Sequence, residues 1–224
     1  LNEMVRLPKN ADFGAVIVSH KNEGDYKFVI ECDGPITRIP SDAFSVVQNC
    51  LKDDNLSIPT TVTHIGDRAF CHNAFLTGKL VIPPSVKSIG REAFSGTDFS
   101  GDLVIPNSVG SIGYGAFSGC NGFNGTLTLP KGLKVIESCA FNSCTRLKGN
   151  LTLPDNLTSI GNSAFYICRM LTGNLVIPKT VKSIGERAFA GCSGFNGTLT
   201  LHEGLETIGK NAFSSCVGLT GDLN

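Results

Sequence analysis

The sequence predicts a mainly β solenoid with a parallel sheet, in which short loops and 3-10 or helical turns join the strands. Two observations support this prediction. Residues 122–129 are identical to residues 194–201, which lie 72 positions further on, or three units of 24. Regular self-similarity of this kind is typical of repeat architectures. The dipeptide Ala-Phe recurs at intervals of 23 to 26 residues, and its aromatic members are Phe44, Phe70, Phe94, Phe117, Phe141, Phe165, Phe189 and Phe213.

Each repeat begins with a short strand. The segment Leu175-Val176-Ile177 points its side chains inward, outward and inward in turn, which predicts a strand with one buried face. Pro178 follows at once and ends the strand, because proline has no N–H group to donate to a ladder.

The second half of each repeat supplies the rest of the core. Val181 and Ile184 are three residues apart, Gly185 permits a turn, and Ala188-Phe189 places one small and one large side chain inward. One unit cannot enclose its own apolar face. Stacking the units at the ~4.8 Å strand spacing sets Leu over Leu and Phe over Phe in one continuous core. Burying each large side chain contributes ~1.5–3 kcal/mol.

The chain is predicted to divide into an N-terminal cap, residues 1–34, and a solenoid of about eight units of roughly 24 residues, residues 35–224. In the cap, Phe13–Val18 and Tyr26–Ile30 are expected to form a β-hairpin around the turn Asn22–Asp25, which would cover the open end of the core. No cap is evident at the other end, where the sequence stops at Asn224 inside the next expected strand. We therefore expect either that the natural protein continues or that a tail was removed.

A short helix is expected in the first unit. Ser41 is a residue type that caps helix N-termini, because its hydroxyl can accept a backbone N–H of the first turn. Apolar residues follow at Phe44, Val47 and Leu51, at spacings that place them on one helix face.

Composition and motifs argue against several classes of function. Lys+Arg and Asp+Glu both total 19, so the formal net charge is zero, and there is no electrostatic basis for binding nucleic acid or an anionic membrane. No apolar run approaches the ~20 residues of a transmembrane helix. The P-loop, Gly-x-Ser-x-Gly and His-Glu-x-x-His motifs do not occur. We expect no catalytic residue, no cofactor and no nucleic-acid partner.

The repeat resembles the BspA-like leucine-rich repeats. Its frame is Leu-x-Ile/Leu-Pro-x-x-Val/Leu-x-x-Ile-Gly-x-x-Ala-Phe-x-x-Cys-x-x-Leu/Phe, and the part from Ile-Gly to Cys is the most specific. The resemblance covers residues from about 36 to 224. Single units depart from it, as where Glu137 replaces the glycine, His202 the proline, and Asn73 and Thr97 the cysteine.

The resemblance has implications for structure and function. It implies a curved, right-handed leucine-rich-repeat solenoid with its parallel sheet on the concave side. Proteins with these repeats are surface or secreted proteins of anaerobic bacteria and some parasitic protists. The resemblance therefore implies an extracellular or cell-surface location and a non-enzymatic role in protein binding or adhesion. The expected partner is a protein or an extracellular-matrix ligand, and we expect the chain to be a monomer.

The cysteines allow two interpretations. A metal site or disulfides are one possibility, and a column of buried thiols that contact loop backbone is the other. Asn73 and Thr97 hold the same position in earlier units, and neither can form a disulfide. We therefore expect a structural column. Its cysteines are Cys120, Cys144, Cys168, Cys192 and Cys216.

A second titratable cluster consists of His64, Asp67, Cys71 and His72. Such a group could bind a metal or provide a Cys/His pair. Yet His64 and Asp67 fall at positions that the repeat leaves outward, where other units carry serine, arginine or glutamate. We expect ordinary surface residues here and no metal site.

The outward residue of each strand defines a possible binding face, which we call the Thr/Val stripe. Its members are Val81, Val104, Thr128, Thr152, Val176 and Thr200. They are flanked by a row of small or polar residues, Lys79, Asp102, Thr126, Asn150, Asn174 and Thr198. The stripe has no aromatic anchor of the kind that dominates protein interfaces, so plain sheet surface is the alternative interpretation. A mildly basic column is better explained as solvated surface, and comprises Lys87, Lys131, Lys134, Lys179 and Lys182.

These observations leave three hypotheses. The preferred one is a surface or secreted binding module that uses the Thr/Val stripe. The second is a passive spacer that holds another domain away from the cell, which the block copying of units favours. A hydrolase or metalloenzyme is the third, and it lacks a recognisable constellation of residues.

Overall fold

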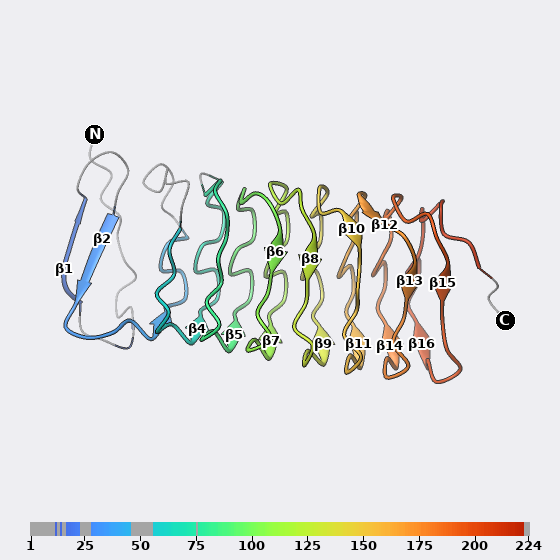
Figure 1. The fold of residues 1–224 in the computed structure, drawn as a ribbon, viewed down its shortest axis with the longest axis horizontal. Coiled ribbons are helices and arrows are strands. Elements are labelled where there is room, and N and C mark those ends of the chain that lie inside the picture. The colour runs from blue at the N-terminus through green and yellow to red at the C-terminus, as the bar shows by residue number, and fades with distance from the viewer. Residues whose placement is uncertain are drawn as a thin grey trace.

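The computed structural model is a parallel β-solenoid, which confirms the predicted fold class. It describes residues 12, 14, 17–22, 28–45, 56–74 and 76–221. The turns stack in a row along the long axis, and the chain runs from one end of the row to the other (Figure 1). Strands β3 to β16 are each two residues long, so every turn is mostly irregular backbone held by its neighbours.

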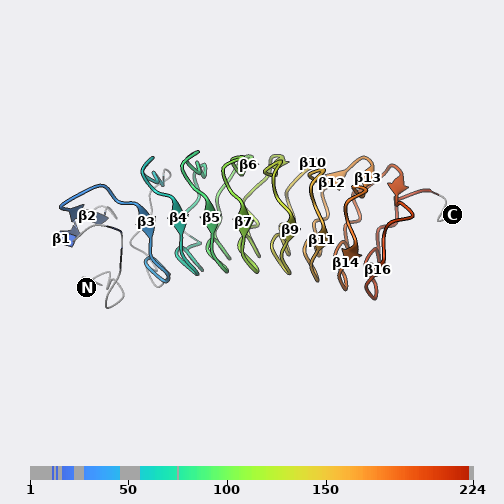
Figure 2. The same ribbon diagram turned by 90° about the horizontal axis from the view of Figure 1, so that it is seen from below.

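The most regular part of each turn is the Ser-Ile segment, which the sequence analysis did not predict as a strand. Two four-stranded parallel sheets run through it, one after the other along the solenoid (Figure 2). The isoleucine of each strand is buried, except Ile208 in the last one, whereas the residue before it faces solvent or is half-buried. Alternation over two residues is too short to stand out in a sequence. The strands are β3 (Arg38–Ile39), β4 (His64–Ile65), β5 (Ser88–Ile89) and β7 (Ser111–Ile112), then β9 (Val135–Ile136), β11 (Ser159–Ile160), β14 (Ser183–Ile184) and β16 (Thr207–Ile208).

The predicted strands at the Leu-x-Ile positions also form, but only in pairs. β6 (Leu103–Val104) pairs with β8 (Leu127–Thr128), and β13 (Leu175–Val176) pairs with β15 (Leu199–Thr200), all in parallel. A third short pair joins β10 (Gly149–Asn150) to β12 (Leu171–Thr172). The expected sheet on this face is therefore interrupted.

The N-terminal region contains an antiparallel strand pair, as predicted, with different bounds. β1 (Ile17–Asn22) pairs with β2 (Phe28–Cys32), so the first strand lies later in the sequence than expected. The helix expected from Ser41 is wrong for the residues described, because 41–45 form turns; Val47 and Leu51 lie outside the described residues. The role of residues 1–34 as a cap stays a prediction.

A column of phenylalanine rings forms the centre of the core. Phe141, Phe165 and Phe189 are fully buried, and their ring centroids are 5.3 Å apart with nearly parallel planes. Parallel stacking adds aromatic contact energy to the ~1.5–3 kcal/mol of each buried ring. The alanine that precedes each ring is buried beside it, as the Ala-Phe dipeptide predicted.

Tight backbone turns follow each Ser-Ile strand, and hydrogen bonds join each of them to its equivalent in the neighbouring repeat. In one unit the N–H groups of Ala188, Ala190 and Cys192 donate to the carbonyl three residues earlier. Residues with left-handed backbone stand next to these donors in the sequence, and their own N–H groups donate to carbonyls of the next repeat. Arg187, for example, has φ of 53° and donates to Lys210 at 3.0 Å. Non-glycine residues in this region cost ~1–2 kcal/mol each, which the ladder must offset.

Glu137 interrupts this regularity. It occupies the position of Gly161, where a Cβ atom would lie only 2.4 Å from the backbone nitrogen of Ser138 in the preceding turn. Gly161 N–H donates to Ile136 at 2.8 Å, and glycines in other turns make the same bond. A side chain at this position therefore requires the preceding turn to move away.

The consequence is a break between the two Ser-Ile sheets. β7 ends one sheet and β9 begins the next, and no backbone bond joins Ile112 to Glu137 within the described turns. The rings of Phe117 and Phe141, which span the same two turns, are 5.7 Å apart, wider than the 5.3 Å of the next two pairs. The core stays continuous where the sheet does not.

Replacing Phe165 by alanine should lower the free energy of unfolding by ~3–5 kcal/mol, because it removes a fully buried ring from the middle of the column. Urea denaturation followed by circular dichroism would measure the change. Thr152→Ala, at an exposed position, is the control and should change stability by less than ~0.5 kcal/mol. A near-neutral Phe165→Ala variant would contradict the stacked core.

Replacing Glu137 by glycine should join the two Ser-Ile sheets, because the N–H of residue 137 would then donate to the Ile112 carbonyl. The added bond contributes ~1 kcal/mol, and the greater chain entropy of glycine offsets ~0.5–1 kcal/mol, so overall stability should barely change. Hydrogen exchange should instead slow at the amide of residue 137. Equal exchange rates in both proteins would show that the glutamate does not cause the break.

Candidate interaction surface

The Thr/Val stripe lies on one exposed face of the solenoid. All six of its residues are exposed, and Val81 is the most exposed valine of the stripe, at 66%. Register pairing sets Val104 beside Thr128 and Val176 beside Thr200. The flanking row from Lys79 to Thr198 is exposed as well. These residues therefore lie at the surface, as the alternation along the strands predicted, and their role in binding stays a prediction.

Two hollows open on this face where the strand pairing is interrupted. One, of about 550 Å³, lies between residues 79–82 and residues 101–104, and Asn124, Gly125 and Lys148 complete it. The other, of about 490 Å³, lies between residues 127–131 and residues 152–156. No strand pair joins the flanking segments at either hollow, and an isolated bridge pairs Lys79 with Ser100 beside the first one. Sequence reasoning missed the hollows because it assumed an unbroken sheet.

The first hollow is lined by charged residues of both signs. The Asp102 carboxylate accepts hydrogen bonds from the Thr126 N–H at 2.6 Å and from the Thr126 hydroxyl at 2.9 Å. These bonds, with the positive charges of Lys148 and Lys79, hold the pKa of Asp102 below its usual value. Asp102 therefore stays ionised and fixed to the next turn, and the hollow carries one carboxylate against two ammonium groups.

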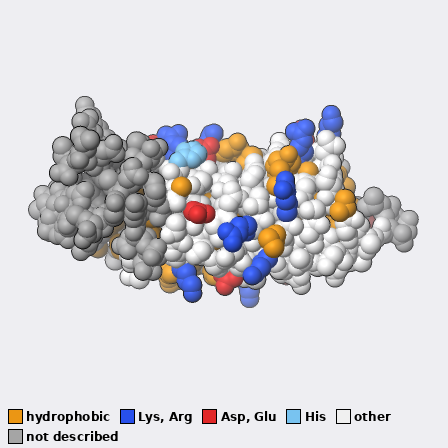
Figure 3. All heavy atoms as spheres, turned by 90° about the horizontal axis from the view of Figure 1, so that it is seen from above, with side chains coloured by type: hydrophobic (Ala, Val, Ile, Leu, Met, Phe, Trp, Pro, Cys, Tyr) orange, Lys and Arg blue, Asp and Glu red, His pale blue; other side chains and the backbone are white. Residues whose placement is uncertain are grey.

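The lysine column is not a continuous basic surface. Glu206 occupies the position equivalent to Lys182 in the next turn, and the two side chains pair at 3.3 Å. Asp155 lies between Lys131 and Lys179 in the same way. Seen from above, charged side chains are scattered singly over largely uncharged surface (Figure 3). These residues do not form a concentrated site for an anionic polymer.

The cysteine column is structural. The Cys144 thiol donates to the Phe117 carbonyl at 3.0 Å, and the Cys168 thiol to the Phe141 carbonyl at 3.1 Å. Cys120, Cys192 and Cys216 make the equivalent bond. Asn73 and Thr97 donate to phenylalanine carbonyls from the same position. Every cysteine whose side chain the structure describes has a free thiol.

The cluster around His64 does not assemble into a site. His64, Asp67 and His72 are exposed, whereas Cys71 is buried. The Asp67 carboxylate accepts the Arg91 N–H of the next turn at 2.7 Å, and His64 bonds to its neighbour Thr63 at 2.8 Å. Within the described residues, no three side chains of metal-binding type come together.

The fold and this surface define a class of protein, the solenoid built from leucine-rich repeats. The model of the BspA type leucine rich repeat region matches the chain in six copies, over residues 37–172 and 123–221. The chain therefore belongs to the BspA-type leucine-rich-repeat family, as the repeat frame indicated.

Solved structures of bacterial proteins share the fold. A leucine-rich repeat protein from Eubacterium ventriosum ATCC 27560 is 22% identical with a TM-score of 0.63; the match covers 74% of this chain and 44% of that one. The T. pallidum leucine rich repeat protein is 21% identical with a TM-score of 0.53, covering 90% and 87%. The chain thus spans less than half the length of the first protein. No curated protein matches the chain.

The structure also bears on membrane insertion. The described part of the chain contains no helix that is long and apolar enough to cross a bilayer.

Native-state alkylation should distinguish the buried thiols from Cys139. Cys144 and Cys168 are fully buried, and burial raises the pKa of each thiol well above its usual value, so neither should react with iodoacetamide until the protein unfolds. Cys139 is half-buried and should be labelled before Cys144 and Cys168. Peptide mapping by mass spectrometry gives the order, and denatured protein is the positive control. Early labelling of Cys168 would contradict the thiol column.

Proposed function

We propose that this protein is a non-enzymatic binding module, located at the cell surface or outside the cell, whose Thr/Val stripe contacts a protein or extracellular-matrix ligand. The single observation that carries the proposal is geometric. The stripe crosses six turns in the outward position, and two hollows of about 490 and 550 Å³ open on it. The location rests on the family resemblance.

The residues of the stripe suit a contact surface. Valine and threonine are β-branched and have few rotamers, so little side-chain entropy is lost when they are covered. The stacked turns fix their backbones. Val104 and Val176 are 50% and 52% exposed, so each offers apolar area that a ligand could cover. The charges that line the two hollows are of both signs and nearly balance, which favours a ligand surface with little net charge.

A passive spacer is the second candidate function. The identity of residues 122–129 and 194–201 supports it, because copied blocks extend the array without creating a unique surface. The two functions differ in one measurable respect. A binder has a saturable ligand, whereas a spacer has none.

Surface plasmon resonance against a panel of purified matrix proteins would test the proposal. We expect saturable binding to at least one of them. The double variant Thr128→Lys with Thr152→Lys places two ammonium groups in one hollow and should weaken that binding at least about tenfold, because the charges would be desolvated in the complex.

Ser111→Lys is the matched control, because Ser111 is exposed on strand β7, which belongs to a Ser-Ile sheet and not to the Thr/Val stripe. It should leave the affinity within about twofold. Binding that both variants retain would reject the stripe as the contact surface. A lack of saturable binding to the whole panel would favour the spacer.

A further inference from the structure

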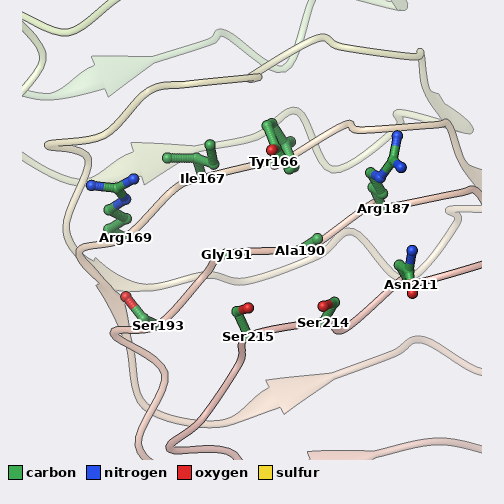
Figure 4. Close-up of a pocket in the computed structure, with 10 residues that line it drawn as sticks. All are labelled: Tyr166, Ile167, Arg169, Arg187, Ala190, Gly191, Ser193, Asn211, Ser214 and Ser215. Carbon is green, nitrogen blue, oxygen red and sulfur yellow. The ribbon is translucent and has the colours of Figure 1, made fainter.

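A third hollow, of about 370 Å³, lies away from the Thr/Val stripe, on the turns that follow the Ser-Ile strands. Three adjacent segments build it, 166–169, 187–193 and 211–215, and the close-up shows them running side by side (Figure 4). Tyr166 and Ile167 stand along one side, and Ser214 and Ser215 along the other. Its volume is within the range of ligand pockets, ~300–1,000 Å³.

The sequence builds this hollow by placing small residues between larger ones. Gly191 occupies the position of Ile167 one turn later, and Ala190 that of Tyr166. A Cβ atom on Gly191 would lie 3.2 Å from the Ile167 side chain, so the missing side chain opens the space. Ser215 takes the same position in the following turn. Ile167 thus stands beside a glycine and a serine in the next two turns, and this step from a large side chain to small ones leaves the hollow.

Ile167 is itself an exception to the repeat. It has left-handed backbone, with φ of 61°, at a position where neighbouring turns place glycine or serine. A β-branched residue in this conformation costs ~1–2 kcal/mol. Tyr166 beside it replaces the serine, asparagine or alanine of the other units from residue 95 onward. Tyr166 and Ile167 are therefore the largest side chains at their two repeat positions from residue 95 onward, and both line this hollow.

The rim of the hollow is rich in hydrogen-bond donors. The hydroxyls of Ser193, Ser214 and Ser215 are exposed and make no hydrogen bond to any part of the chain that the structure describes. The guanidinium of Arg169 is likewise without a carboxylate partner among the described residues. Each of these groups can donate to an oxygen of a ligand.

The charge of the hollow is positive. Arg169 and Arg187 lie at opposite ends of it (Figure 4). Arg187 also approaches the carboxylate of its neighbour Glu186, at 3.4 Å between charged atoms, on exposed surface where such a pair is weak. Planar guanidinium groups bind carboxylates by two parallel bonds, which favours an acidic ligand.

Apolar side chains line the same site. They belong to Tyr166, Ile167 and Ala190. Tyrosine and arginine are enriched in protein interfaces. The apolar side chains of the hollow can pack against aliphatic side chains of a ligand. A peptide carries such side chains and a sugar chain does not, so the lining favours a peptide over an acidic glycan.

We propose that the hollow between Ile167 and Ser215 binds an acidic protein segment, whose carboxylates pair with Arg169 and Arg187 and whose apolar side chain packs against Tyr166 and Ile167. The site is separate from the Thr/Val stripe and does not depend on the function proposed for it.

Selection of a random peptide library against the full chain tests this inference, with the Ser214→Tyr variant as counter-selection. Ser214 is exposed, and its equivalent two turns earlier is Tyr166, so the repeat accepts tyrosine in this column while the hollow becomes filled. We expect the selected peptides to combine Asp or Glu with Leu, Ile or Val. Arg169→Gln or Arg187→Gln, measured by fluorescence anisotropy with a labelled selected peptide, should weaken binding about tenfold.

Matched controls lie one turn away. Asn142→Tyr adds the same ring in the same column outside the hollow, and Arg146→Gln removes an exposed guanidinium beyond it; both should leave the affinity within about twofold. Thermal melts confirm that each variant folds.

The proposal is overturned if no peptide is enriched, if the selected peptides lack acidic residues, or if they bind Ser214→Tyr as tightly as the parent. A heparin-derived oligosaccharide and sialyllactose are probed in parallel. If either binds the parent and loses that affinity in Ser214→Tyr while no peptide binds, the site recognises an acidic glycan and the peptide proposal is wrong.

Discussion

The register of each turn on the next is the constraint on which the structure depends. Three contacts fix it at once: the backbone ladders, the stacked phenylalanine rings and the thiols that donate to the phenylalanine carbonyls. These contacts recur along the solenoid, although Glu137 interrupts one ladder and Asn73 and Thr97 replace the thiol in two turns, so an error of one residue would break several contacts together. This coupling explains how strands of two residues can persist, since each is held by the core beneath it and by the turns on both sides.

The same constraint separates the residues that can vary from those that cannot. An inward position must hold a similar side chain in every turn, whereas an outward position faces no such demand. The exceptions to the repeat therefore show where the structure departs from regularity. Glu137 separates the two Ser-Ile sheets, and Ile167 with Gly191 opens a hollow. In both cases one side chain changes the spacing or the surface between two turns and leaves the core intact.

Much of this could be predicted from the sequence, because the inward positions repeat. The position of a residue within the repeat is enough to predict the burial of Phe165, the alignment of the cysteines and the exposure of the Thr/Val stripe. The Ser-Ile strands were missed because two residues carry no detectable period. The helix expected from Ser41 was wrong where the structure describes it, since local capping preference yielded to the ladder that joins Asp42 to Asp67. The hollows depend on side chains in neighbouring turns, which one unit read by itself does not reveal.

The two kinds of surface differ in how they relate to repetition. The stripe is copied with the units, as Thr126 and Thr128 return as Thr198 and Thr200, so any contact it makes can recur along the array and add up through multivalency. The hollow at Ile167 occurs where the repeat is broken, and the units on either side carry glycine or serine in its place. A surface that recurs suits weak contacts with an extended ligand, whereas a single hollow suits one specific segment. Both can operate in one solenoid, because the core that fixes the turns makes no demand on either face.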